Sequence, residues 1–129
     1  MEYILRHWHR LEEKLTNKYV MLFLDYDGTL TPIVESPYKA LISKETKVLL
    51  KNLSNIQSCK IAVISGRTLN DIKKMLEIKN VIYAGNHGLE IEGPKIKFKS
   101  SVSPGYRKIL QQIKNDLRIR LSNIKGAFV

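Results

Sequence analysis

Two aspartates, Asp25 and Asp27, follow an apolar run directly, and Gly28 and Thr29 come after them. A carboxylate can attack the phosphorus of a phosphate ester, and the resulting aspartyl phosphate divides one difficult hydrolysis into two easier steps. A second carboxyl group can protonate the leaving alkoxide and then deprotonate the attacking water. Glycine permits a tight turn that brings backbone N–H groups toward a bound anion. The pattern therefore indicates phosphoryl-transfer chemistry at Asp25 and Asp27.

Two further apolar runs also end in polar or glycine-rich residues. Residues 60–64 lead into Ser65, Gly66 and Arg67, and residues 81–84 lead into Gly85, Asn86, His87 and Gly88. N–H groups at the start of a helix attract phosphate, and an imidazole with a primary amide suits sugar hydroxyls and phosphate. The alternatives are structural, namely a serine at a turn and a histidine in a loop.

The apolar run at 20–24 predicts a strand that is buried on both faces of a parallel sheet. The runs at 60–64 and 81–84 predict a second buried strand and a third strand. Apolar spacings of three and four predict a leading helix over 2–16 and helices after Ser43 and Thr68. Ser43 is a candidate N-cap, and Thr68 with Asp71 resembles a capping box. The alternation of strands and helices predicts an α/β fold with right-handed crossovers. Ligands bind at the carboxyl ends of strands in such sheets, so the three polar strand ends should converge on one site.

The pattern changes after Gly88. Residues 89–92 and 95–99 flank Gly93-Pro94 and predict an antiparallel hairpin. Ser103 and Pro104 predict the start of a helix that reaches about Ser122. Residues 125–129 resemble the start of another strand. We therefore expect one module over 1–88 and the beginning of a second over 89–129.

The chain has 129 residues, of which 43% are hydrophobic and 26% charged, as expected for one soluble globular core. No apolar stretch approaches the roughly 18 residues that span a bilayer, and charged residues occupy the amino terminus, so we expect a cytoplasmic protein without membrane contact. The single cysteine, Cys59, lies beside an apolar run and is expected to be a packed hydrophobe.

The formal net charge of +10 favours encounters with anionic partners, either phosphorylated metabolites or nucleic acid. The lysines are spread along the whole chain, without a dense basic arm or interleaved aromatic residues. This spread disfavours nucleic-acid binding. We therefore expect a small sugar phosphate as the partner and no nucleic acid.

The segment Asp25-Tyr26-Asp27-Gly28-Thr29-Leu30 resembles the first motif of the haloacid dehalogenase-like (HAD) phosphatases. The resemblance implies a HAD-like Rossmannoid parallel sheet, the first half of the core, followed by the start of an α+β cap. It implies that Asp25 is the nucleophile and a Mg²⁺ ligand. Asp27 would be the general acid and base, with its backbone carbonyl on the metal. Ser65 matches the second motif, which binds phosphoryl oxygens.

A narrower resemblance, to trehalose-6-phosphate phosphatases, rests on three segments in the right order: residues 25–33, 65–67 and 85–90. It implies Mg²⁺-dependent hydrolysis of trehalose 6-phosphate to trehalose and phosphate, in trehalose biosynthesis. In that family the Gly-Asn-His-Gly segment lies beside the substrate and leads into a mobile cap that grips the sugar. The implied substrate- and phosphate-binding residues are Thr29, Ser65, Gly66, Arg67, Asn86, His87 and Glu90.

The family's third motif, a lysine, and its fourth, a group of acidic residues, have no counterpart in this sequence. Asp25 with one Asp27 carbonyl would leave a magnesium site dependent on water. The strand over 20–24 would also become an exposed apolar edge, which invites self-association or pairing with a missing C-terminal half. Two other functions stay open, namely a phosphatase for another sugar phosphate and a non-catalytic fragment that needs a second half.

Overall fold

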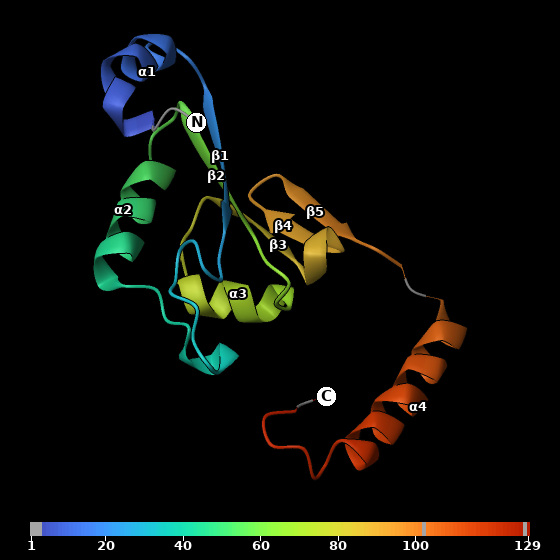
Figure 1. Cartoon of the computed structure of the whole chain (residues 1–129). Helices are drawn as coiled ribbons and strands as arrows, with labels where there is room; N and C mark the ends of the chain where they lie inside the picture. The colour runs from blue at the N-terminus through green and yellow to red at the C-terminus, as the bar shows by residue number, and fades with distance from the viewer. Residues whose placement is uncertain (1–3, 102, 128) are drawn as a thin grey trace. The chain divides into compact units, whose positions relative to one another are not determined.

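The computed structural model describes residues 4–101, 103–127 and 129, which fall into two compact units that divide after Lys99. The first unit holds a five-stranded sheet in the order β1-β2-β3-β4-β5 (Figure 1). Its parallel strands are β1 (Val20–Asp25), β2 (Cys59–Ile64) and β3 (Val81–Gly85). Its antiparallel strands are β4 (Glu90–Gly93) and β5 (Ile96–Lys99). The predicted α/β fold, with parallel strands followed by a hairpin, is confirmed.

Side-chain N-caps lie at the start of two helices of this unit. Ser43 accepts a hydrogen bond from the Thr46 N–H at the start of α2 (Lys44–Ser54). Thr68 accepts one from the Asp71 N–H at the start of α3 (Leu69–Leu76), as the predicted caps require. The leading helix is 3₁₀ in η1 (Ile4–His7) and α-helical in α1 (Trp8–Leu15). The predicted residues 2 and 3 of that helix lie outside the described range.

Helices α2 and α3 form the core by packing against one face of the sheet (Figure 1). Leu50 from α2 and Ile72 with Leu76 from α3 are buried in it. The strands contribute Cys59, Ile61, Val63, Val81 and Tyr83. Cys59 is thus the packed hydrophobe that its surroundings in the sequence indicate.

The opposite face of the sheet is open within the described residues, which corrects the prediction that the strand over 20–24 is buried on both faces. Exposure alternates along β1, so that Leu22 and Leu24 turn toward the core while Phe23 is 64% exposed. A strand is buried on both faces only when both faces are covered. Here both packed helices, α2 and α3, contribute to the same core.

The hairpin β4–β5 extends the same sheet, since β4 pairs with β3. The first compact unit therefore ends after β5, and the boundary between a core and a cap at residue 88 stays a prediction. The second unit contains α4 (Pro104–Arg120), which begins with the expected proline but without a side-chain cap bond from Ser103. Residues 121–126 form turns and bends, and residue 127 is outside a strand, so the strand expected over 125–129 is wrong in its described part. Phe128 lies outside the described residues.

No helix of the described chain has the length and apolarity to cross a membrane.

A close backbone contact joins the end of β3 to the start of α3. A Cβ atom added to Gly85 would lie 2.4 Å from the Leu69 nitrogen and 2.6 Å from the Leu69 Cα. Only glycine fits this approach, because backbone atoms cannot move aside as the tip of a flexible side chain can. The contact holds the loop after β3 against the loop after β2.

We therefore predict that Gly85→Ala destabilises the protein by about 1–3 kcal/mol, the usual cost of overpacking. The free energy of unfolding, from urea denaturation followed by circular dichroism, measures the effect. Gly105→Ala is the control, since its Cβ would meet only the Ser103 hydroxyl, at 3.7 Å. Equal unfolding free energies for Gly85→Ala and the parent chain would contradict the described contact.

Candidate active site

The first strand ends in a tight turn that presents both aspartates at the carboxyl edge of the sheet. Gly28 has a φ of +90°, and its N–H donates to the Thr31 carbonyl at 2.9 Å. The N–H groups of Leu30 and Thr31 both donate to the Tyr26 carbonyl at 3.0 Å. Positive φ favours glycine, so the turn expected after the aspartates has the residue that it needs.

The Asp25 carboxylate is exposed at this edge and lies near one neighbouring hydroxyl. Thr29 Oγ1 donates a hydrogen bond to Asp25 Oδ2 at 3.3 Å. Asp25 also aligns with Ile64 in the parallel pairing of β1 and β2, so it lies beside the start of the Ser65 loop. A ligand can reach the accessible carboxylate from solvent, and the Thr29 hydroxyl orients one of the carboxylate oxygens.

Tyr26 lies between the two aspartates in the sequence, and its side chain anchors the turn to the protein core. Its side chain is fully buried, and its hydroxyl donates to the Ala40 carbonyl at 2.9 Å. Burial raises the pKa of Tyr26, while the nearby Arg67 acts in the opposite direction. The phenol therefore stays neutral and ties the turn to the irregular segment over 31–42. Our sequence analysis gave this tyrosine no role, although a large aromatic residue between two exposed aspartates was a usable signal.

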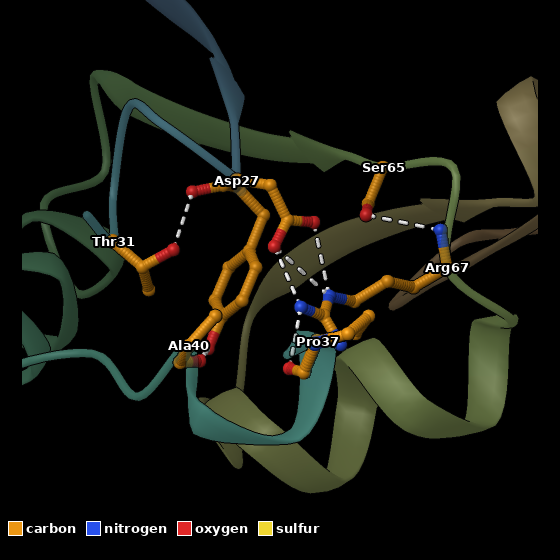
Figure 2. Close-up of polar contacts among 7 residues, drawn as sticks. Asp27, Thr31, Pro37, Ala40, Ser65 and Arg67 are labelled. Atoms are coloured by element: carbon orange, nitrogen blue, oxygen red, sulfur yellow. Dashed lines mark hydrogen bonds and ion pairs between the residues drawn. The ribbon is translucent and has the colours of Figure 1, made fainter. Parts of the chain in front are cut away.

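Arg67 reaches from the loop after β2 to Asp27, as Figure 2 shows. Its Nη2 lies 2.6 Å from Asp27 Oδ1, and its Nε lies 2.9 Å from Asp27 Oδ2. Nη2 also donates to the Pro37 carbonyl at 2.8 Å, and the guanidinium lies 5.5 Å from the Tyr26 ring centroid. Hydrogen bonding to Asp27 raises the pKa of Arg67, so the guanidinium stays charged. Its role as a phosphate ligand remains a prediction, because this geometry commits the guanidinium to Asp27.

The loops after β2 and β3 are hydrogen bonded to each other. The Ser65 N–H donates to the Ala84 carbonyl at 2.9 Å, and the His87 N–H donates to the Ser65 carbonyl at 3.2 Å. Ser65 is buried, and its Oγ accepts the Arg67 N–H at 3.1 Å. A Cβ at Gly66 would lie 2.7 Å from the His87 Cε1 atom. The missing side chain at Gly66 therefore makes room for the His87 imidazole.

Several of the residues described above line one hollow of about 430 Å³, whereas Asp25, Thr29 and Ser65 are not among its lining residues. Asp27, Gly66, Arg67 and His87 form its polar part. Its other walls are Pro32, Ile33, Val34, Pro37 and Ala40, all from the irregular segment. The two prolines of that segment, Pro32 and Pro37, were a usable signal in the sequence for a defined backbone path. A carboxylate, a guanidinium and an imidazole around one hollow suit a ligand with negative charge and hydroxyl groups.

Asn86 and Glu90 form a separate cluster beside this hollow. Asn86 Nδ2 donates to Glu90 Oε2 at 2.7 Å, and Lys99 Nζ lies 2.7 Å from Glu90 Oε1. The Lys99 ammonium lowers the pKa of Glu90. Glu90 lines another hollow, together with Thr68 and Lys97. The structure does not place Glu90 at the hollow that holds Asp27, and substrate contacts of Asn86 and Glu90 stay predictions.

The donors near Asp25 and Asp27 fit Mg²⁺ in kind, because carboxylate and carbonyl oxygens are the ligands this ion prefers. Asp25 offers an exposed carboxylate, and Asp27 lies two residues further along the same turn. Within the described ranges, no group of three or more histidine, cysteine, aspartate or glutamate residues is placed to hold a metal. Asp25 and Asp27 could supply part of an octahedral shell.

Known proteins match this chain over most of its length. The trehalose-phosphatase family profile matches residues 23–129. The chain is 40% identical over 77 residues to trehalose-phosphate phosphatase B of Arabidopsis thaliana, a match that covers 60% of this chain and 20% of that protein. It is 31% identical over 119 residues to the probable trehalose-phosphate phosphatase C of the same plant, covering 87% of this chain and 37% of the relative. The chain thus spans much less than the full length of these relatives.

Solved structures give the same result. The C-terminal domain of trehalose-6-phosphate phosphatase from C. albicans matches with a TM-score of 0.70 and 30% identity, over 87% of this chain and 40% of that one. Trehalose-6-phosphate phosphatase from Aspergillus fumigatus matches with a TM-score of 0.65 and 27% identity, over 87% of this chain and 43% of that one. With the family profile covering most of its residues, the chain belongs to the trehalose-phosphatase family.

Proposed function

We propose that this chain supplies the nucleophile and the phosphate-binding loops of a Mg²⁺-dependent trehalose-6-phosphate phosphatase. One observation carries the proposal: the turn after β1 and the loops after β2 and β3 line one hollow, with Asp27, Gly66 and His87 in its wall. The family gives the substrate class, since the matched relatives are trehalose-phosphate phosphatases.

In the proposed reaction, an Asp25 carboxylate oxygen attacks phosphorus and the bond from phosphorus to the sugar oxygen breaks. The Asp27 carboxyl group gives its proton to the leaving sugar oxygen. In the second step Asp27 takes a proton from water, whose oxygen attacks phosphorus, and the bond to Asp25 breaks. The Asp25 carboxylate and the protonated Asp27 carboxyl group are restored, and trehalose and phosphate are released. Bound Mg²⁺, held by the Asp25 carboxylate and the Asp27 carbonyl, would neutralise phosphate charge during this chemistry.

The contact between Arg67 and Asp27 sets a condition on this mechanism. Both Asp27 carboxylate oxygens accept hydrogen bonds from the guanidinium. An oxygen that transfers a proton to the substrate has to give up at least one of these bonds. Arg67 therefore holds Asp27 in a fixed resting position, and substrate binding would have to release part of that contact.

Two other candidate functions keep specific support. A different sugar phosphate is compatible with the same turn, because Asp25 and Asp27 would act on the phosphate and its ester oxygen and not on the rest of the sugar. A fragment that needs a second half is supported by the share of the relatives that the chain spans, 20% of the Arabidopsis phosphatase B and 40% of the C. albicans domain. The first alternative is tested by which phosphate ester the chain hydrolyses. The second is tested by whether the chain hydrolyses any phosphate ester alone.

The first test is release of inorganic phosphate from trehalose 6-phosphate by the purified chain with Mg²⁺. We expect Asp25→Asn to lower the rate by more than about a thousandfold, the order lost when a nucleophile is removed. Asp116→Asn, which changes an exposed carboxylate in α4, should keep the parent rate. A panel with glucose 6-phosphate and sucrose 6-phosphate tests the sugar.

Phosphate release that is unchanged in Asp25→Asn would reject the nucleophile. Faster release from another ester would reject the trehalose assignment. No release from any ester by the parent chain would favour the fragment that needs a second half.

The second test concerns Arg67 as the group that fixes the segment around Pro37. We expect Arg67→Gln to speed amide hydrogen exchange at Lys39 and Ala40, because their N–H groups bond within the turn that Arg67 holds through the Pro37 carbonyl. Hydrogen exchange with mass spectrometry measures this. Arg120→Gln is the matched control, since Arg120 also forms an arginine–aspartate pair, with Asp116. Equal exchange in both variants would show that Arg67 does not hold the segment.

A further inference from the structure

Three consecutive residues after β3 have a left-handed backbone. The φ angles are +50° at Asn86, +56° at His87 and +89° at Gly88. Glycine adopts this conformation readily, but a residue with a Cβ atom adopts it at a cost and usually as a single residue. Such conformations persist only where surrounding contacts hold them, and they gather at functional sites. The turn after β3 therefore needs contacts that hold Asn86 and His87 in place.

Backbone hydrogen bonds supply part of this hold. The Asn86 N–H donates to the Arg67 carbonyl at 2.7 Å, and the His87 N–H donates to the Ser65 carbonyl at 3.2 Å. The Leu89 N–H donates to the Asn86 carbonyl at 3.2 Å and closes the turn. These bonds attach the turn to the loop after β2, and they involve backbone groups of the turn alone.

Glu90 adds a contact to a side chain of the turn. Asn86 Nδ2 donates to Glu90 Oε2 at 2.7 Å. Glu90 is the first residue of β4 and pairs with Gly85 at the end of β3, so it starts from a fixed place in the sheet. The left-handed conformation is costly because it brings Cβ close to the following carbonyl oxygen. A bond to the Asn86 amide holds the side chain beyond that Cβ, where the backbone bonds do not act.

Lys99 holds the second oxygen of the Glu90 carboxylate. It lies directly opposite Glu90 in the pairing of β4 with β5, and its Nζ lies 2.7 Å from Glu90 Oε1. The Glu90 side chain is only 19% exposed. The Lys99 ammonium also lowers the pKa of Glu90, so both oxygens stay acceptors. This arrangement requires a carboxylate, because a glutamine would turn an NH₂ group toward one of the two donors.

The place of the His87 imidazole depends on this turn. A Cβ added to Gly66 would lie 2.7 Å from the His87 Cε1 atom and 2.9 Å from its Nε2 atom, so the ring lies directly over Gly66. The ring also lines the hollow that contains Asp27. Within the described residues no hydrogen bond holds the imidazole. The backbone of the turn and the packing over Gly66 therefore decide where the ring lies.

We propose that Glu90 is a positioning residue, which acts through Asn86 to hold the left-handed turn that places the His87 imidazole in the wall of the hollow. Both Glu90 oxygens are already engaged, so this role replaces the direct substrate contact that the family resemblance implies for Glu90. The effect on the turn is independent of catalysis. The effect on a phosphate in the hollow rests on the proposed function.

The first test compares Glu90→Ala with the double variant Asn86→Gly/Glu90→Ala in the full 129-residue chain. Three-bond NMR couplings across the N–Cα bond of His87 report its φ angle. We expect Glu90→Ala to move His87 out of the left-handed conformation. Adding Asn86→Gly should bring it back, because glycine adopts positive φ without a side-chain contact. An unchanged His87 φ in Glu90→Ala, or a change that Asn86→Gly does not reverse, would overturn the proposal.

Glu92→Ala is the matched control. Glu92 also lies on β4 opposite a lysine of β5, Lys97, and it forms an ion pair with Lys73. Its removal deletes an ion pair of the same hairpin and leaves the bond between Glu90 and Asn86 in place, so the His87 couplings should equal those of the parent. An equal change in Glu92→Ala and Glu90→Ala would show a general loss of hairpin stability and overturn the positioning role.

The second test is a titration with inorganic phosphate and Mg²⁺, followed at the Gly66 amide. Inorganic phosphate has no sugar hydroxyls, so a sugar contact of Glu90 could not affect this reading. We expect Glu90→Ala to weaken phosphate binding by about tenfold, the loss that corresponds to one hydrogen bond to a charged group, and the double variant to recover it. Equal affinity in Glu90→Ala and the parent would overturn the link between the turn and the site. A parent chain that binds no phosphate would reject the proposed function, while the His87 couplings would still decide the role of Glu90.

Discussion

The candidate site depends on the backbone contact between the loops that follow β2 and β3. Gly85 lies so close to Leu69 that a Cβ would stand 2.4 Å from the Leu69 nitrogen. Next to this contact, the Asn86 N–H donates to the Arg67 carbonyl at 2.7 Å, and the His87 N–H donates to the Ser65 carbonyl at 3.2 Å. These bonds fix His87 beside Gly66. The parallel pairing of β1 with β2 then brings Asp25 to the same edge.

The backbone contacts between these loops also determine where the charged side chains of the site lie. Arg67 starts at the loop after β2 and ends at Asp27, across the hollow. Tyr26 supports both groups from the core through its bond to the Ala40 carbonyl. The segment over 31–42 therefore forms a wall of the site, held by a buried phenol and by one guanidinium contact at Pro37.

The sequence was sufficient to predict the α/β fold and the three parallel strands, whose polar ends lie at one edge of the sheet. Those features follow from local patterns, namely apolar runs that end in Asp25, Ser65 and Gly85. It was insufficient for the orientation of Arg67 and for the place of Glu90, because each depends on a partner distant in the sequence, Asp27 in one case and Lys99 in the other. Burial on both faces of the sheet was predicted from apolar runs alone, and it requires covering elements that the described residues do not provide.

The most direct test of one anion site at three strand ends is a titration of the isotope-labelled chain with inorganic phosphate in the presence of Mg²⁺, followed by amide NMR. The backbone amides of Gly28, Gly66 and His87 should shift together and fit one dissociation constant, because all three belong to loops at the same edge. Shifts confined to one loop, or scattered over surface lysines without the Gly66 amide, would contradict the account.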